Sequence, residues 1–355
     1  MKTIYNIRPK GMNVGNDAIA LAMQNFIFKA CGELVNIVTI PATSKYDGGG
    51  LYGLTKRSIH EINQFADGVI VGGGNLYENG EIDIDQTALK ALRAPLMVFS
   101  VSRGRIFSKK GELVERTDVI SDTNLKAISL RADINLVRDS ATVDYINSIG
   151  APATLGVCPT IFLNQIANSF PLNEGVRQHS QNSVIISVRN PELMNVPPSY
   201  QRQTRMDIAE LIGKFKEGGK VVRILCHDHR DIAFAKSFSE PWTYTSDVYT
   251  YLSLIKHAEL IVTYRLHSFL PALSFGTPVV KVSYDERAIS LISDLGYDNW
   301  NINVMQGNVT EQVYDRLNSL PNLDKLKKKN KALWNSYEET MLSNFSEFNA
   351  LMSNA

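Results

Sequence analysis

One stretch of the chain, residues 260–273, passes from an apolar strand into a helix within a few residues. The strand pattern ends at Arg265 and His267, and apolar residues at helical spacing follow at once. The first N–H groups of a helix lack intrahelical partners and lie at the positive end of the helix dipole, so they attract anions. Arg265 adds bidentate recognition of phosphate or carboxylate, and His267 adds a proton donor near neutral pH. This junction predicts chemistry on a small anion.

Strand-like and helix-like segments alternate along the whole chain. Such alternation predicts parallel sheets joined by right-handed crossovers. A length of 355 residues fits two domains better than one, and residues 164–182, rich in Asn, Gln and Ser, are typical of an interdomain linker. We therefore predict an α/β protein with two doubly wound, Rossmann-like domains that face a cleft. The ligand site is expected where the carboxyl ends of both sheets meet.

The predicted boundaries follow from this pattern. The expected units are an N-terminal α/β domain (1–168), a C-terminal α/β domain (169–320) and a C-terminal helix (321–355). Packing of this helix back on the N-terminal domain is one candidate arrangement. The expected strands span residues 3–7, 35–40, 68–71, 96–101, 135–138, 154–157, 184–188, 221–226, 260–263 and 279–283. The expected helices span residues 16–30, 56–65, 86–92, 119–129, 140–149, 205–216, 231–238, 248–256, 268–275, 287–295, 310–319 and 323–348.

Composition excludes several classes of protein. A formal net charge of +1 gives no basis for non-specific binding to nucleic acid, and we expect no such partner. The three cysteines, Cys31, Cys158 and Cys226, fit no disulfide or zinc spacing and predict reduced thiols in a cytoplasmic protein. Residues 1–9 lack the apolar core of a signal peptide, and no run of about 18 apolar residues would span a membrane.

Two glycine-containing segments follow expected strands in the first half. Residues 11–17 (Gly-Met-Asn-Val-Gly-Asn-Asp) open a helix, either as a plain turn capped by Asn16 or Asp17 or as a loop that approaches a ligand. They carry two of the three glycines of a dinucleotide fingerprint and no phosphate-loop lysine. Asp17 disfavours phosphate there and favours a sugar hydroxyl. The glycines at 72–74 cost conformational entropy, which indicates either close passage of a substrate, with Asn75 and Glu78 at the rim, or a flexible turn.

Polar residues also follow the expected strands of the second half. Arg189 ends one strand, in the position from which an open α/β sheet contacts a ligand, although a solvated or salt-bridged arginine is the alternative. Residues 227–229 (His-Asp-His) follow the next strand, and since no third ligand cluster accompanies them we expect a polar loop and no metal. Residues 283–287 end a strand and open a helix, so their acidic side chains are either dipole partners or a pocket wall.

These motifs, in this order, resemble the polysaccharide pyruvyl transferase family. The Arg-Leu-His element, followed by Gly-x-Pro and Tyr-Asp, is the most specific part of the likeness. The resemblance implies a GT-B-like enzyme that moves the enolpyruvyl carbons of phosphoenolpyruvate onto two hydroxyls of a sugar, giving a cyclic ketal and phosphate. The matching segments are residues 11–19, 69–76, 136–140, 186–189, 262–271 and 276–285, within a likeness that covers residues 5–295.

The resemblance also implies roles for individual residues. The donor would sit on the C-terminal domain, with His267 as the general acid, and the sugar would enter over the N-terminal loops. The implied catalytic residues are His267, Arg265 and Asp17; the donor-binding residues are Arg189, Arg265, His227, Ser268 and Tyr284; the acceptor-binding residues are Asn13, Gly15, Asn16, Asp17, Gly73, Gly74 and Asn75.

The chain departs from the family pattern in places. Cys158 precedes a proline where many members have Asp, residues 102–105 replace a glycine-rich turn, and Arg287 stands where lysine is frequent. These departures concern the acceptor side more than the donor side. The alternative enzyme is a nucleotide-sugar-dependent GT-B glycosyltransferase, with Asp285 or Glu286 on the ribose hydroxyls. A non-catalytic protein that binds anions or saccharides is a third hypothesis.

The expected partners are phosphoenolpyruvate as co-substrate, with no other cofactor and no metal, and a saccharide acceptor for a bacterial exopolysaccharide or capsule. The five lysines within residues 325–331 predict either a solvated helix face or, with a lipid-linked acceptor, attraction to an anionic membrane surface. The expected place is therefore the cytoplasm, with at most peripheral contact with the inner face of the membrane.

Overall fold

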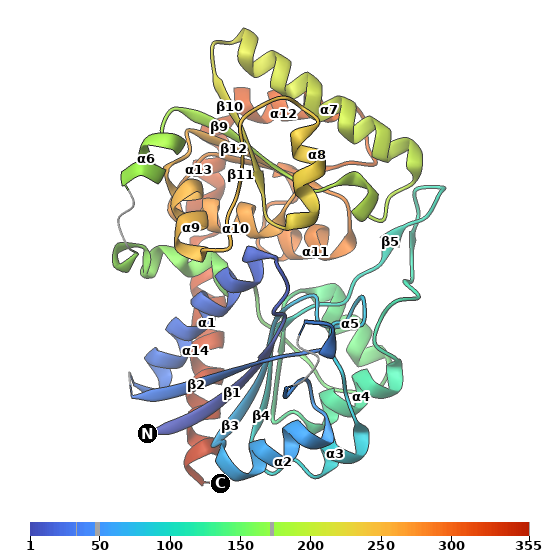
Figure 1. Ribbon diagram of the computed structural model, residues 1–355, viewed down its shortest axis with the longest axis vertical. Helices are drawn as coiled ribbons and strands as arrows, with labels where there is room; N and C mark the ends of the chain where they lie inside the picture. Colours follow the sequence, from blue (N-terminus) through green and yellow to red (C-terminus); the bar gives the residue numbers. More distant parts are fainter. Residues whose placement is uncertain (33, 47–49, 171–173, 355) are drawn as a thin grey trace.

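The computed structural model describes residues 1–32, 34–46, 50–170 and 174–354 of the chain. Two lobes lie one above the other in Figure 1, and each contains a parallel sheet covered by helices. Strands from the first half of the chain form the lower sheet, and strands from the second half form the upper sheet.

The lower lobe is the N-terminal one. Its sheet contains β1 (Lys2–Arg8), β2 (Val35–Pro41), β3 (Gly68–Gly74), β4 (Leu96–Val101), β7 (Ile134–Val137) and β8 (Thr154–Leu155). Its helices include α1 (Val14–Cys31), η1 (Ser44–Tyr46), α2 (Lys56–Phe65), α3 (Gln86–Lys90), α4 (Asp122–Arg131) and α5 (Ser140–Ser148). A hairpin of β5 (Ile106–Phe107) and β6 (Leu113–Val114) rises beside the upper lobe (Figure 1).

The upper lobe follows two short 3₁₀ helices, η2 (Pro159–Gln165) and η3 (Ala167–Ser169). Its sheet contains β9 (Ser183–Val188), β10 (Val221–Cys226), β11 (Trp242–Tyr244), β12 (Leu260–Thr263), β13 (Val279–Ser283) and β14 (Asn301–Asn303). Its helices include α6 (Glu174–Ser180), η4 (Pro191–Leu193), α7 (Pro198–Glu217), η5 (His229–Asp231), α8 (Ile232–Lys236), α9 (Val248–His257), α10 (Leu266–Phe275), α11 (Glu286–Asp294), η6 (Asp298–Trp300), α12 (Val309–Asn318) and α13 (Leu320–Lys329). The last helix is α14 (Lys331–Asn354).

Both sheets reverse their strand order once. The lower sheet runs β2-β1-β3-β4-β7-β8, and the upper sheet runs β11-β10-β9-β12-β13-β14. The reversals fall between β1 and β3 and between β9 and β12, and in such sheets ligands bind at the carboxyl ends of the strands beside the reversal. The predicted α/β architecture of two doubly wound, Rossmann-like domains is therefore confirmed.

The central strands are buried on both faces. Strands β9, β12 and β13 are buried along their whole lengths, which explains their near-continuous apolar sequences because helices cover both sides of a parallel sheet. Lys281, in the middle of β13, is the exception to that apolar pattern.

Helix α14 leaves the upper lobe and runs along the lower one (Figure 1). Phe345 packs between Phe26 of α1 and Phe99 of β4, with ring centroids 5.9 and 4.9 Å away. Lys2 at the start of β1 donates from Nζ to the carbonyl oxygen of Asn349 at 2.7 Å. The end of the chain therefore ties the two lobes together by packing on the N-terminal core. Among the described residues, no helix has both the length and the apolar character needed to cross a bilayer.

Several boundaries differ from those expected. The linker predicted at 164–182 contains the end of η2, then η3 and α6, while its residues 171–173 lie outside the described residues. The helix predicted at 119–129 begins later, because Ser121 caps it by accepting from the backbone N of Asn124 at 3.3 Å. The helix predicted at 323–348 is two helices, divided at Asn330, whose side chain donates to the carbonyl of Gly296 at 2.9 Å.

Candidate active site

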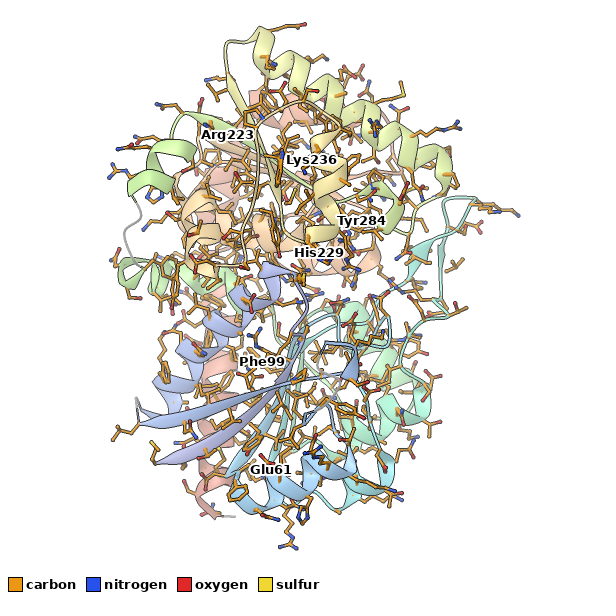
Figure 2. All side chains as sticks on the ribbon, viewed as in Figure 1. Glu61, Phe99, Arg223, His229, Lys236 and Tyr284 are labelled. Atoms are coloured by element: carbon orange, nitrogen blue, oxygen red, sulfur yellow. The ribbon has the colours of Figure 1, made fainter. Side chains whose placement is uncertain are left out.

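A cavity of about 660 Å³ lies between the lobes, at the carboxyl ends of both sheets. His229 and Tyr284, two of its lining residues, lie at the boundary between the lobes in Figure 2. Among the residues predicted from the sequence, those at the cavity wall are Asn13, Asn16, Asn75, Arg189, Arg265, His267 and Tyr284. Those that the wall of the described cavity does not include are Gly15, Asp17, Gly73, Gly74, His227 and Ser268.

The strand-to-helix junction after β12 is rigidly built. Thr263 donates from Oγ1 to the carbonyl of Arg265 at 3.0 Å and accepts from its backbone N at 2.9 Å. Arg265 occupies the cap position of α10, and the Tyr251 hydroxyl donates to the carbonyl of His267 at 2.6 Å. Both functional side chains therefore stand on a fixed backbone.

The Arg265 guanidinium is buried in the wall of the cavity. Among the described residues it has neither a hydrogen-bond acceptor nor a carboxylate at ion-pair distance. Burial opposes its charge, but Tyr284, Asp231 and Asp228 outweigh that effect and raise the pKa of Arg265. A buried guanidinium without a direct partner is poised to receive an anion.

Arg189, at the end of β9, also lines the cavity. Its Nη1 lies 3.4 Å from Asp228 Oδ2 and 3.4 Å from Asp231 Oδ1. Burial, followed by the charge of Arg265, lowers the pKa of Arg189. Two guanidinium groups from the strands beside the reversal therefore converge on one cavity, as the sequence predicted.

His267 is partly buried and lines the cavity. Its Nε2 has no hydrogen-bond partner among the described residues. Burial, then the charges of Arg138, Arg265 and Arg287, hold the pKa of His267 well below its usual value. The ring is therefore neutral in the ligand-free protein at pH 7, and it needs a nearby anion to become a proton donor.

Gly15 of α1 lies directly against this ring. A Cβ atom at Gly15 would be 2.6 Å from His267 Nδ1 and 2.9 Å from its Cβ. The glycine predicted to contact the acceptor thus has a packing role between the lobes. It lets α1 approach the imidazole of His267 in the other domain.

Replacing Gly15 by alanine should lower activity roughly tenfold or more, because ångström-scale displacement of a catalytic group is costly. The fold should persist, since alanine favours a helix over glycine. Gly213→Ala on α7 is the matched control, because a Cβ there meets nothing within 4 Å. Equal turnover numbers for the Gly15 and Gly213 variants would refute the steric role.

His227 and Ser268 were predicted to contact the donor directly. Both lie behind the cavity wall and do not line it. His227 Nε2 is 2.8 Å from Ser187 Oγ and 3.0 Å from Ser268 Oγ, and its Nδ1 is 3.1 Å from the Tyr251 hydroxyl. Burial and the charge of Arg265 hold the pKa of His227 well below its usual value. This neutral, fully buried network supports the backbone of the Arg265–His267 junction.

The remaining acceptor-side predictions also have structural explanations. Asp17 pairs with Arg8 Nη1 at 2.7 Å, which removes it as a free base. Gly73 and Gly74 have φ of +87° and +82°, and a Cβ at Gly73 would lie 2.6 Å from Cγ2 of Ile19. Left-handed backbone and close packing on α1 therefore account for both glycines without a substrate.

Six lysines and arginines of the wall were not among the predicted site residues: Lys45, Arg116, Arg138, Arg230, Lys281 and Arg287. Three of them lie in or shortly after strands β7 and β13. Arg138 follows β7 and donates to Ser102 Oγ. Arg287 is the second residue of α11 and pairs with Asp285. Lys281 stands inside β13. Each of these three carried a signal in the sequence. Arg138 follows a strand within a matched segment, Arg287 stands where the family frequently has lysine, and Lys281 interrupts an apolar strand.

Ion pairs join the lobes around the cavity. Glu78 of the lower lobe is fully buried, 2.6 Å from Arg287 Nη1 and 3.2 Å from Arg116 Nη1. Arg105 Nε donates to Glu286 Oε1 at 2.9 Å, so Glu286 is already engaged across the interface. These contacts join the walls that the two lobes contribute to the cavity. Within the described parts of the chain, no cluster of three or more His, Cys, Asp or Glu residues could hold a metal ion.

Solved structures with a similar fold are nucleotide-sugar enzymes. They include S. aureus MnaA with UDP (TM-score 0.55, 15% identity, 92% of this chain and 90% of that chain). The UDP-GlcNAc 2-epimerases of Methanocaldococcus jannaschii with UDP-GlcNAc and UDP (0.53, 14%, 90% and 92%) and of Neisseria meningitidis with UDP-GlcNAc (0.52, 12%, 100% and 99%) are also similar. At these identities the likeness concerns the fold alone.

The sequence itself gives the closer assignment. No curated protein sequence matches the chain significantly. Residues 13–286, more than half of the chain, match the sequence profile described as Polysaccharide pyruvyl transferase, and the matched region contains the Arg189, Arg265 and His267 positions. The chain therefore belongs to the polysaccharide pyruvyl transferase family.

Proposed function

We propose that this enzyme transfers the enolpyruvyl carbons of phosphoenolpyruvate to two hydroxyls of a cell-surface saccharide, forming a cyclic ketal and releasing phosphate. The supporting observation is that Arg189, Arg265 and His267 line one interdomain cavity and that His267 Nε2 has no hydrogen-bond partner among the described residues. Phosphoenolpyruvate has a carboxylate and a phosphate close together, so two guanidinium forks match its charge.

The reaction needs a proton at the methylene carbon. His267 Nε2 delivers it to C3 while the first sugar hydroxyl adds to C2 and loses its own proton. The second hydroxyl then bonds to C2, the C2–O bond to phosphate breaks, and the phosphate leaves with that hydroxyl's proton. The proton of the first hydroxyl replaces the one that His267 gave to C3, and the proton of the second hydroxyl leaves on the phosphate. No external oxidant or reductant is needed.

The anionic donor itself makes His267 a competent acid. The free imidazole is neutral partly because three arginines surround it. A ligand with two anionic groups offsets those charges and favours the imidazolium. The ion pairs that join the lobes, such as Glu78 with Arg287, keep bulk water from the cationic C2 during the reaction.

A nucleotide-sugar donor is the competing proposal. Such a donor needs a carboxylate for the ribose hydroxyls. The two carboxylates that the sequence offered, Asp285 and Glu286, are paired with Arg287 and Arg105. Because both carboxylates are already in ion pairs, the site favours phosphoenolpyruvate, a small donor with two anionic groups, over a nucleotide sugar.

Calorimetry with phosphoenolpyruvate and with UDP tests the donor class. We expect binding of phosphoenolpyruvate, and phosphate release once a saccharide acceptor is added, with a new ketal methyl signal by NMR. Binding of UDP without binding of phosphoenolpyruvate would overturn the proposal. A panel of galactose-, mannosamine- and glucose-containing acceptors then identifies the sugar.

Arg189→Lys should weaken the binding of phosphoenolpyruvate roughly tenfold, because a point charge cannot replace a bidentate fork. The lysine keeps the positive charge beside Asp228 and Asp231, so thermal stability should change little. The measurement is the dissociation constant by calorimetry beside the melting temperature. An unchanged dissociation constant would remove Arg189 from the donor site.

A further inference from the structure

Lys281 is a charged residue inside a buried strand. Its side chain is fully buried on β13, yet it lines the cavity. Strand register places it beside Thr263 of β12, two residues before Arg265, and beside Asn301 of β14. The mechanism above gives this lysine no role, although its side chain lies next to the Arg265 junction.

The surroundings of Lys281 do not neutralise it. Its Nζ donates to the carbonyl of Val282, and the ring of Tyr284 lies 5.8 Å away. The charged groups that affect it are Asp285, which is committed to Arg287, and the like-charged Arg265. Burial lowers the pKa of Lys281 to about 7. Burying an ammonium group without a counter-ion costs stability, so packing alone does not explain this residue.

The other buried or partly buried arginines of the wall differ in this respect. Arg116, Arg138, Arg189 and Arg287 each have a carboxylate at ion-pair distance. Among the buried cations that line the described cavity, Arg265 and Lys281 are the two without one.

We propose that Lys281 is a donor-binding residue whose ammonium receives the phosphate group of the donor, while Arg265 takes the carboxylate. This inference rests on the proposed function and deepens it. A lysine acts on phosphate as a compact point charge, whereas a guanidinium fork matches a planar carboxylate. The same site binds the inorganic phosphate that the reaction releases.

The assignment has a pH signature. Because phosphate favours the charged form of Lys281, binding takes up a proton above the pKa of the free group. Affinity for phosphate should therefore weaken as pH rises above about 7. Arg265 and Asp285, the charged groups that affect Lys281, remain ionised across this range. The second ionisation of the phosphate probe also falls near pH 7, but it is the same for every variant, so the trend assigned to Lys281 is the difference between wild type and Lys281→Arg.

The test compares Lys281→Met with wild type, using inorganic phosphate as the probe and calorimetry as the readout. We expect roughly tenfold weaker binding, as for loss of one charged hydrogen bond, and a melting temperature that is equal or higher. Lys327→Met on α13 is the matched control, since Lys327 is partly buried and also has a lowered pKa but does not line the cavity. Lower stability with unchanged phosphate affinity would overturn the inference.

Lys281→Arg gives a second readout. Arginine does not titrate in this range, so the loss of affinity above pH 7 should disappear while binding persists. If wild type binds phosphoenolpyruvate and the Met variant binds phosphate equally well, only the role of Lys281 fails. If wild type binds neither phosphoenolpyruvate nor phosphate, the proposed function fails as well.

Discussion

Replacing His267 by alanine is expected to lower kcat roughly 100-fold or more, because a positioned general acid contributes about 10²–10⁴-fold. The ring touches Gly15 of the opposite domain and makes no side-chain hydrogen bond through Nε2, so its loss removes the acid without opening a polar network. Binding of phosphoenolpyruvate should persist, since Arg189 and Arg265 remain. Single-turnover phosphate release beside calorimetry separates the two effects.

The control for that experiment is His60→Ala, on the exposed face of α2, where the imidazole contacts only Gln64 at 2.8 Å among the described residues. Its kcat should equal that of wild type. If His267 is the acid, donor binding should be accompanied by proton uptake near pH 7, because the free ring is neutral and the bound ring is charged. Wild-type turnover in the alanine variant, or proton uptake that is the same in both, would exclude His267 as the acid.

The sequence predicted the fold well where burial imposes a simple pattern. Strands β9, β12 and β13 are covered on both faces, and their apolar runs stand out between helices. The edge strands β11 and β14, three residues each, were missed because so short a segment shows no period. The β5–β6 hairpin was missed for the same reason.

The candidate site was predictable where a residue follows a strand beside the order reversal. Arg189 and Arg265 meet that condition, and the structure places both at the cavity. Contacts between domains were not predictable, because nothing local in the sequence shows that Gly15 faces His267 or that Glu78 pairs with Arg287. Several residues assigned to the acceptor therefore have roles in packing.

These packing roles connect the fold to the chemistry. The cavity exists in its observed form only while the lobes hold their distance, which α14, the Glu78–Arg287 pair and the Gly15–His267 contact set together. Under the proposed function the donor contacts residues that follow strands of a single sheet, and the acceptor contacts loops of the other lobe. Acceptor choice would then depend on interdomain geometry as well as on side chains.

Replacing Arg265 by glutamine is expected to weaken the binding of phosphoenolpyruvate roughly 100-fold or more, because two charge-assisted hydrogen bonds of about 1.5–3 kcal/mol each are lost. The free protein should not lose stability, since the guanidinium is buried and has no carboxylate at ion-pair distance among the described residues. Arg223→Gln on β10 is the matched control, because Arg223 lies in the upper lobe far from the boundary between the lobes (Figure 2) and contacts Ser183. Calorimetry and thermal melts of both variants give the comparison. A stable Arg265→Gln variant that binds phosphoenolpyruvate as tightly as wild type would mean that the anion is held elsewhere, whereas weaker binding at unchanged stability assigns this guanidinium to the donor.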